Sequence, residues 1–136
     1  MSERMIKVGL CGFGVVGQGV FDHLDRKRAV LSEQLGAEIT VSRIAVRNIG
    51  KARDIAVDAS IVTDDPLAVA TDPEIDVICE LMGGTGIARE VVLAALRAGK
   101  IVITANKALL CDFGEELLSV AREHGGHLLF EASVAG

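Results

Sequence analysis

The chain has 136 residues, of which 50% are hydrophobic and 24% are charged, so it is a folded domain rather than an intrinsically disordered chain. Its net charge of -5 argues against nucleic acid as a partner. The longest stretch without charged residues, 8–21, is too short and too rich in glycine to cross a membrane, and residues 1–7 do not resemble a secretory signal. We therefore expect a cytoplasmic protein with no membrane partner.

The first third of the sequence predicts a strand, a turn, a helix and a second strand. Residues 6–11 form a nearly continuous apolar run, which is typical of a buried parallel strand. Apolar residues then recur at close to the helical period over about 15–34, and Gly36 follows, so we expect one amphipathic helix there. The β-branched run over 39–46 predicts the second strand.

The remaining two thirds continue this alternation of strands and helices. The predicted elements are a short strand over 60–63, a short helix over 66–71 with Asp65 as its cap, a strand over 76–81, a helix over 87–98, a strand over 101–104, a helix through 113–121 and a strand over 128–130. Parallel strands need long crossovers, which the helices supply. The sequence therefore predicts an α/β fold over residues 1–136, a doubly wound parallel sheet of about six strands in the dinucleotide-binding order 3-2-1-4-5-6.

A glycine pattern, G-x-G-x-x-G, occupies residues 12–17, directly between the first strand and the first helix. Gly12 allows the tight turn, Gly14 lets the backbone approach a pyrophosphate, and Gly17 lets helix and strand pack closely. Glycine turns also occur as packing devices alone, but this β-turn-α-β context favours dinucleotide binding. The residues expected to bind the cofactor here are Gly12, Phe13, Gly14, Val15, Val16 and Gly17.

The end of the second strand indicates which dinucleotide is preferred. No acidic residue is present there to accept a hydrogen bond from a ribose 2′-hydroxyl, whereas Arg47, Lys51 and Arg53 could face a 2′-phosphate. We therefore favour NADP over NAD. The alternative is that these cations are solvated loop residues, and we expect this of Arg43 in particular.

Residues that follow the fourth and fifth strands should lie at the same edge of the sheet as the glycine turn. They include Gly83 and Gly84, expected to contact the cofactor, and Lys107. Lys107 could bind a substrate anion or neutralise charge near the nicotinamide, or it could be an ordinary surface lysine. Glu80 and Glu131 are candidates for pairing or for metal ligation, and the residues alone leave this open.

Cysteine and histidine offer no catalytic constellation in this sequence. The three cysteines, Cys11, Cys79 and Cys111, are widely spaced in apolar or helical surroundings, so we expect small core residues or ordinary thiols rather than disulfides or a zinc site. We assign no catalytic role to the histidines.

Four segments together resemble the successive motifs of homoserine dehydrogenase. They are GLCGFGVVG at 9–17, ELMGG at 80–84, TANK at 104–107 and EASVAG at 131–136, and the last two are much more specific than the glycine pattern. The resemblance implies an oxidoreductase that interconverts L-homoserine and L-aspartate 4-semialdehyde with NAD(P), a step towards threonine and methionine.

The resemblance also implies roles for individual residues. Residues 12–17 would bind the pyrophosphate, Arg47 the 2′-phosphate, and Lys107 would lie beside the nicotinamide and the substrate as a catalytic residue. A monovalent cation, usually sodium in this family, would be held through Glu131 and the backbone carbonyls of Val134 and Gly136.

In this family the chain continues into a substrate-binding and dimerising region that supplies the proton-transfer residues. We therefore expect residues 1–136 to be the nucleotide-binding domain of the monofunctional form, rather than of the aspartokinase fusion, with the substrate domain absent from this chain. Such a chain would bind cofactor without turning over homoserine, and its parent enzyme would be a homodimer or homotetramer. Two alternatives are the cofactor domain of another NAD(P)-dependent dehydrogenase and a non-enzymatic dinucleotide-sensing module.

Overall fold

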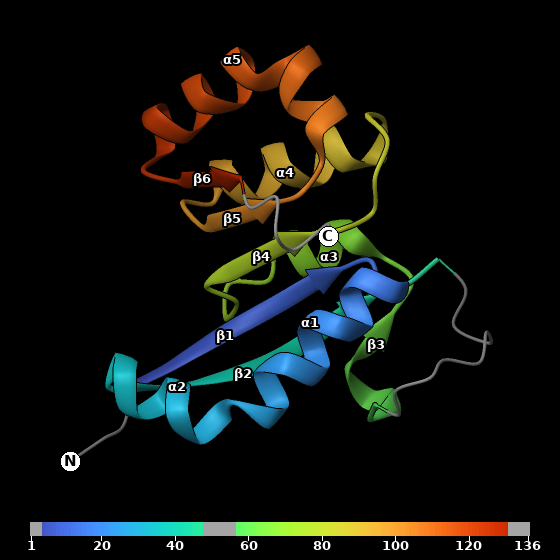
Figure 1. Cartoon of the computed structure of the whole chain (residues 1–136). Coiled ribbons are helices and arrows are strands. Elements are labelled where there is room, and N and C mark those ends of the chain that lie inside the picture. The colour runs from blue at the N-terminus through green and yellow to red at the C-terminus, as the bar shows by residue number, and fades with distance from the viewer. Residues whose placement is uncertain (1–3, 48–56, 131–136) are drawn as a thin grey trace.

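The computed structural model describes residues 4–47 and 57–130. The strands of these residues form one parallel sheet in the order β3-β2-β1-β4-β5-β6 (Figure 1). The strands are β1 (Arg4–Cys11), β2 (Ala37–Ala45), β3 (Val62–Thr63), β4 (Val77–Glu80), β5 (Ile101–Thr104) and β6 (His127–Phe130). The helices are α1 (Val15–Arg26), α2 (Arg28–Leu35), α3 (Pro66–Ala70), α4 (Ile87–Arg97) and α5 (Lys107–His124). The predicted doubly wound α/β fold and its strand order are confirmed.

Helices cover both faces of the sheet, so the domain has two hydrophobic cores. Leu10 and Cys11 are both fully buried, yet they belong to different cores because successive strand residues point to opposite faces. The core that contains Leu10 also receives Phe21 of α1, and the core that contains Cys11 receives Leu117 of α5. Figure 1 shows α1 and α2 along β1 and β2, with α4 and α5 beside β5 and β6.

The helix predicted over 15–34 is divided in two, so the prediction of one continuous helix was wrong. Lys27 separates α1 from α2, and its backbone dihedrals, φ -101° and ψ 12°, lie outside the helical range. Residues 25–30, between Leu24 and Leu31, are all exposed, so no buried side chain in this stretch packs the helix against the core. Beyond Lys27 the chain changes direction and α2 packs against β2.

The irregular segment before β4 is close to its prediction. A 3₁₀ turn occupies Ala59–Ile61, which leaves only Val62–Thr63 as strand β3. Asp65 caps α3 as expected, since its side-chain Oδ1 accepts a hydrogen bond from the Ala68 N–H at 3.1 Å. Within the described ranges, 4–47 and 57–130, no helix is long and apolar enough to span a membrane.

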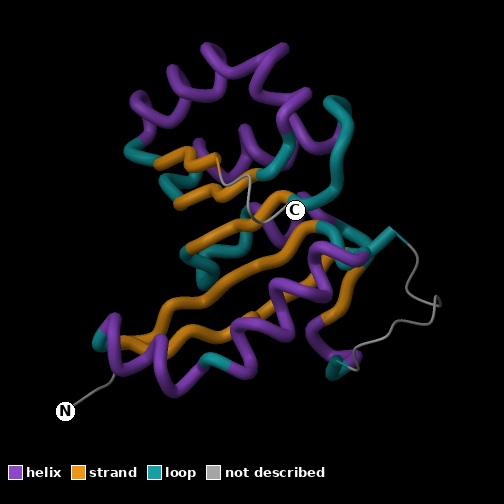
Figure 2. The backbone as a smooth tube through the Cα atoms, viewed as in Figure 1, coloured by secondary structure: helices purple, strands orange, loops and turns teal. Residues whose placement is uncertain are grey.

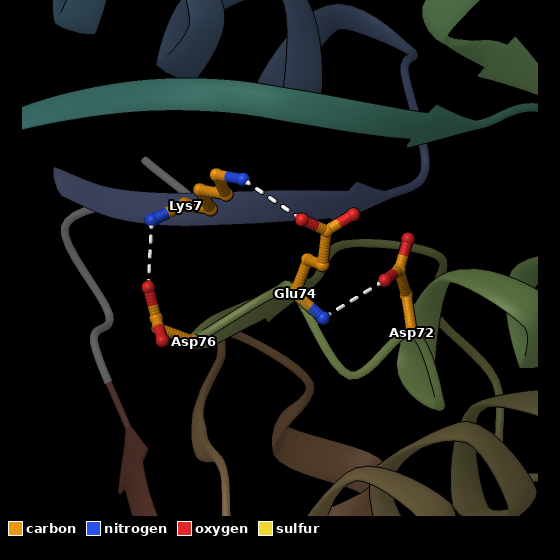
Figure 3. Close-up of polar contacts among 4 residues, drawn as sticks. All are labelled: Lys7, Asp72, Glu74 and Asp76. Atoms are coloured by element: carbon orange, nitrogen blue, oxygen red, sulfur yellow. Dashed lines mark hydrogen bonds and ion pairs between the residues drawn. The ribbon is translucent and has the colours of Figure 1, made fainter.

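Polar contacts attach the entrance of β4 to β1, at the end of the sheet remote from the glycine turn (Figure 3). The Lys7 N–H donates to Asp76 Oδ2 at 2.9 Å, and Lys7 Nζ forms an ion pair with Glu74 Oε1 at 3.3 Å. The Glu74 N–H in turn donates to Asp72 Oδ1 at 2.9 Å. The buried amino group of Lys100 donates to the carbonyl oxygens of residues 72 and 75, which closes the same turn.

An ion pair with fork geometry joins α4 to α5. Arg89 Nε donates to Glu116 Oε1 at 2.7 Å, and Arg89 Nη2 donates to Glu116 Oε2 at 2.6 Å. The same guanidinium lies 4.8 Å from the centre of the Phe113 ring, which gives it a cation–π contact. This arrangement fixes two helices that cover the half of the sheet formed by β4, β5 and β6.

Candidate functional site

The glycine turn after β1 is built from close backbone contacts that no side chain could replace. Gly12 has a φ of +113°, and a Cβ there would lie 2.8 Å from the carbonyl oxygen of Leu81. A Cβ at Gly17 would lie 2.3 Å from the carbonyl oxygen of Gly12. An added Cβ at Gly14, by contrast, would have no atom within 4 Å. Gly12 and Gly17 are therefore required by the fold, whereas Gly14 leaves open space at the surface.

The open space at Gly14 lies at the N-terminus of α1. Gly14 is the N-cap residue, no side chain caps the helix, and its first turn has no acidic residue. The first N–H groups of a helix have no partner within the helix, and the helix dipole favours an anion there. A pyrophosphate fits this position because Gly14 gives it room and the helix end offers it donors.

The remaining residues of the glycine pattern present different surfaces. Phe13 is buried and its ring meets that of Phe21 edge to face, with centroids 5.8 Å apart. Val15 is 90% exposed, and Val16 is half-buried. Phe13 therefore anchors the turn to the core, while the side chain of Val15 faces away from it.

The end of β2 lies directly beside the glycine turn. The Gly12 N–H donates to the carbonyl oxygen of Ala45 at 2.9 Å, and exposed Arg47 follows two residues later. The structure thus places Arg47 at the same edge as the turn, as the sequence predicted. Lys51 and Arg53, the other two expected cations, lie outside the described residues.

Arg43 differs from its prediction as a solvated loop cation. It lies within β2 and is half-buried, and its Nε is a buried donor without a hydrogen-bond partner among the described residues. The prediction was wrong because strand β2 continues past Arg43, which keeps the base of this side chain against the sheet. Arg43 therefore belongs to the sheet rather than to the basic loop that follows it.

A buried chain of hydrogen bonds joins the ends of β4 and β5. The Glu80 side chain is fully buried, and its Oε1 accepts from the Thr104 hydroxyl at 2.8 Å. Glu80 Oε2 accepts from the backbone N–H groups of Met82 at 2.9 Å and Gly83 at 3.3 Å. Thr104 Oγ1 also accepts from the Asn106 N–H at 3.0 Å. Three donors therefore satisfy Glu80, which makes hydrogen-bond pairing its observed role.

Asn106 continues this chain to the helix that begins with Lys107. Its Oδ1 accepts from the Leu109 N–H at 3.0 Å, which caps α5, and its Nδ2 donates to the carbonyl oxygen of Gly84 at 2.6 Å. Lys107 is exposed as the first residue of α5. Gly83 and Gly84 are also exposed, and both have positive φ, +78° and +73°. The predicted glycine loop and lysine are thus brought to one edge.

The loops after β1, β4 and β5 lie at the carboxyl end of the sheet, as Figure 2 shows. Sequence reasoning placed these loops together but did not identify Asn106 as the residue that joins two of them. The available signal was an asparagine directly before a helix, which is typical of an N-cap. Its second contact, to Gly84, depends on the distance between the loop after β4 and the loop after β5 in the folded sheet. The local sequence pattern does not contain that distance.

The cysteines contribute no nucleophile to this edge. Cys11 and Cys79 are buried and Cys111 is exposed on α5, and all three are free thiols. Burial raises the pKa of the Cys11 thiol to about 12, with the charge of Glu80 adding to the increase. Burial also raises the pKa of Cys79 to about 11. Both buried thiols are therefore neutral at physiological pH.

The predicted cation ligands Glu131, Val134 and Gly136 lie outside the described residues. Among residues 4–47 and 57–130, no group of three or more His, Cys, Asp or Glu side chains forms a metal site.

Comparison with known proteins identifies the family. Residues 12–131 match the sequence model of the homoserine dehydrogenase NAD-binding domain. Homoserine dehydrogenase of Pseudomonas aeruginosa is 45% identical over 133 residues, which are 98% of this chain and 30% of that protein. The Bacillus subtilis enzyme is 38% identical over 98% of this chain and 31% of its own length. The chain therefore spans about a third of the length of the curated relatives that it matches.

Solved structures agree with this assignment. Homoserine dehydrogenase of S. aureus has a TM-score of 0.89 at 33% identity, covering 97% of this chain and 33% of that one. The Thiobacillus denitrificans enzyme has a TM-score of 0.87 at 41% identity, covering 97% of this chain and 31% of that one. The resemblance seen in the sequence motifs is confirmed, and the chain belongs to the NAD-binding domain family of homoserine dehydrogenase.

Proposed function

We propose that this chain supplies the cofactor site of an oxidoreductase that interconverts L-homoserine and L-aspartate 4-semialdehyde, using NADP in preference to NAD. The observation that carries the proposal is the glycine turn, where Gly14 leaves open space at an uncapped helix N-terminus. When bound, the nicotinamide accepts or donates the hydride. The chain's own residues bind and orient the dinucleotide.

Backbone groups hold the pyrophosphate in this proposal. Residues 12–17 bring the N-terminal N–H groups of α1 to the phosphates. Gly83 and Gly84 border the nicotinamide half of the dinucleotide. The glycine turn needs no charged side chain for this task, because the first N–H groups of α1 and the helix dipole already favour an anion.

The preference for NADP depends on Arg47. Its position beside the glycine turn suits a guanidinium that donates two hydrogen bonds to a 2′-phosphate. No acidic residue within the described end of β2 competes for this position by binding a 2′-hydroxyl.

Lys107 is the proposed catalytic residue of this chain. Two observations support this role: Lys107 is exposed at the start of α5, and it directly follows Asn106, which contacts Gly84. In the proposal its charge lies at the nicotinamide half of the site. A positive charge there neutralises an anionic substrate or the charge that develops during hydride transfer. The groups that move the substrate proton would come from the region that the longer relatives possess. By this proposal, the 136-residue chain alone binds cofactor without turnover.

Three further expectations belong to the same proposal. A sodium ion bound through Glu131, Val134 and Gly136 stays a prediction, as do a cytoplasmic location and a homodimeric or homotetrameric parent enzyme. Calorimetric titration of the parent enzyme with sodium, with and without Glu131→Ala, tests the cation site. Light scattering of the same enzyme tests its oligomeric state.

A chimaeric enzyme tests the reaction itself. This chain would replace the matching 30% of Pseudomonas aeruginosa homoserine dehydrogenase, and in this design the rest of that enzyme would supply the substrate region. The proposal expects NADP reduction that depends on L-homoserine, and it expects Lys107→Met to abolish turnover while NADPH still binds. A folded chimaera that binds NADPH but leaves homoserine unchanged would contradict the proposal and favour a dinucleotide-sensing role.

A further inference from the structure

The strongest unassigned feature at the site is the buried chain from Glu80 through Thr104 to Asn106. Its exposed fractions are 0%, 0% and 8% respectively, so water does not compete for these hydrogen bonds. This series of hydrogen bonds ends at exposed Gly84, whose carbonyl oxygen accepts from Asn106 Nδ2 at 2.6 Å. A buried network therefore holds an exposed loop.

The loop that Asn106 contacts contains two adjacent glycines with open space around them. Gly83 and Gly84 both have positive φ and no atom within 4 Å of an added Cβ, so packing does not restrain them. Glycine also loses more conformational freedom on ordering than any other residue. Two hydrogen bonds to described residues hold this pair: the Gly83 N–H donates to Glu80 Oε2, and the Gly84 carbonyl oxygen accepts from Asn106 Nδ2.

The position of this loop relates it to one half of the dinucleotide. In a doubly wound sheet the adenosine ribose lies at the end of β2, so the nicotinamide half crosses to β4 and β5. Asn106 connects the loop after β4 with the helix after β5, and Lys107 is its next neighbour along the chain. The contact thus fixes the separation between two elements that border the nicotinamide half.

We infer that Asn106 is a positioning residue, which presets the spacing between the Gly83–Gly84 loop and Lys107 for the nicotinamide half of the cofactor. The inference rests on the proposed function. A loop held in its binding conformation before the ligand arrives does not pay the ordering cost on binding. The role is separate from helix capping, because capping uses Oδ1 and the loop contact uses Nδ2.

Asn106→Ser separates these two roles. Serine is as good an N-cap as asparagine, so its hydroxyl keeps the contact to the Leu109 N–H, but it has no amide to donate to Gly84. The change is neutral and adds no charge near the phosphates. Asn106→Asp is the second variant, since it also keeps the cap and places an acceptor opposite the Gly84 carbonyl.

The test combines two measurements on the 136-residue chain. Amide hydrogen exchange follows the Gly83 N–H as the reporter of the loop and the Leu109 N–H as the internal control for the cap. Calorimetry compares NADPH with 2′-phospho-ADP-ribose, which lacks the nicotinamide. We expect both variants to exchange Gly83 faster with Leu109 still protected. We expect Asn106→Ser, which adds no charge, to lose about tenfold in NADPH affinity without a change for 2′-phospho-ADP-ribose.

Several outcomes would overturn the inference. In Asn106→Ser, unchanged exchange at Gly83 or unchanged NADPH affinity would show that Asn106 does no more than cap α5. Equal losses for both compounds would show that its effect is not directed at the nicotinamide half. Failure of the folded wild-type chain to bind either compound is a different result, because it refutes the proposed function. In that case exchange at Gly83 still decides whether Asn106 holds the loop.

Discussion

Gly17 lies so close to Gly12 that a Cβ on Gly17 would be 2.3 Å from the Gly12 carbonyl oxygen. This contact joins the first turn of α1 to the end of β1 and shapes the turn between them. Gly14, two residues after Gly12, has open space instead. The fold therefore constrains Gly12 and Gly17, whereas the constraint on Gly14 comes, in our proposal, from the ligand.

A matched pair of serine substitutions separates these constraints. Gly17→Ser forces a side chain against backbone and should destabilise the domain by about 1–3 kcal/mol. Gly14→Ser fits the open space and adds a favourable N-cap to α1, so its stability should equal or exceed that of the wild type. Urea unfolding followed by circular dichroism measures both. Equal stability of the two variants would refute the packing role of Gly17.

Arg47→Ala tests the proposed 2′-phosphate contact. Hydrogen bonds to charged groups contribute about 1.5–3 kcal/mol, so NADPH affinity should fall by about ten- to a hundredfold. NADH lacks the 2′-phosphate, and its affinity should not change. Arg122→Ala, at an exposed position in the last turn of α5, is the control for removal of a positive charge. Equal losses for NADPH and NADH would show that Arg47 does not read the 2′-phosphate.

The three thiols should differ sharply in reactivity. Burial holds the pKa of Cys11 at about 12 and that of Cys79 at about 11, whereas Cys111 is exposed. Only the thiolate reacts readily, so iodoacetamide at pH 8 should label Cys111 alone in the folded chain and all three cysteines in urea. Mass spectrometry of tryptic peptides identifies the labelled sites. Rapid labelling of Cys79 in the folded chain would contradict its burial.

The same raised pKa values make the fold sensitive to alkali. The unfolded thiols ionise near their ordinary pKa of 9.0, while the folded thiols stay neutral until much higher pH. Stability should therefore be intact below pH 9 and decline as the pH rises from there towards the folded-state values. Cys79→Ala should reduce this alkaline decline, as measured by thermal unfolding across the pH range. An unchanged slope would contradict the linkage.

The stability that the Arg89–Glu116 pair contributes between α4 and α5 should decrease in acid. The hydrogen bonds from the Arg89 guanidinium lower the pKa of Glu116, so the pair stabilises the fold above the ordinary glutamate pKa and loses this effect as the pH falls through the lowered value. Glu116→Gln should lower the melting temperature at pH 7, and the difference should disappear in acid. Glu115→Gln, at the neighbouring exposed carboxylate, is the control. A difference that persists in acid would show that packing, not charge, is responsible.

Local patterns predicted the elements of this fold well because strands and helices here have strong, uninterrupted apolar periods. The pattern failed at Lys27, which lies in the exposed stretch 25–30, where no buried side chain packs the helix against the core. The expectation for Arg43 also failed: the strand predicted over 39–46 already contained this residue, and its half-buried side chain belongs to β2 rather than to the loop cations.

In the candidate site, too, the sequence predicted local features better than contacts between distant residues. The glycine pattern predicted its own position because each of its residues acts within a few neighbours along the chain. Asn106 and Glu80 act on loops more than twenty residues away or across strands, so their partners became visible only once the sheet had brought β4 and β5 together.

Calorimetric titration of the wild-type chain and of Gly14→Ser with NADPH tests the central claim most directly. The account predicts that the wild type binds NADPH and that Gly14→Ser, although folded, binds at least about tenfold more weakly, because the serine hydroxyl takes the helix donors and its side chain fills the space for the pyrophosphate. Absence of NADPH binding by the folded wild type, or equal binding by Gly14→Ser, would contradict it.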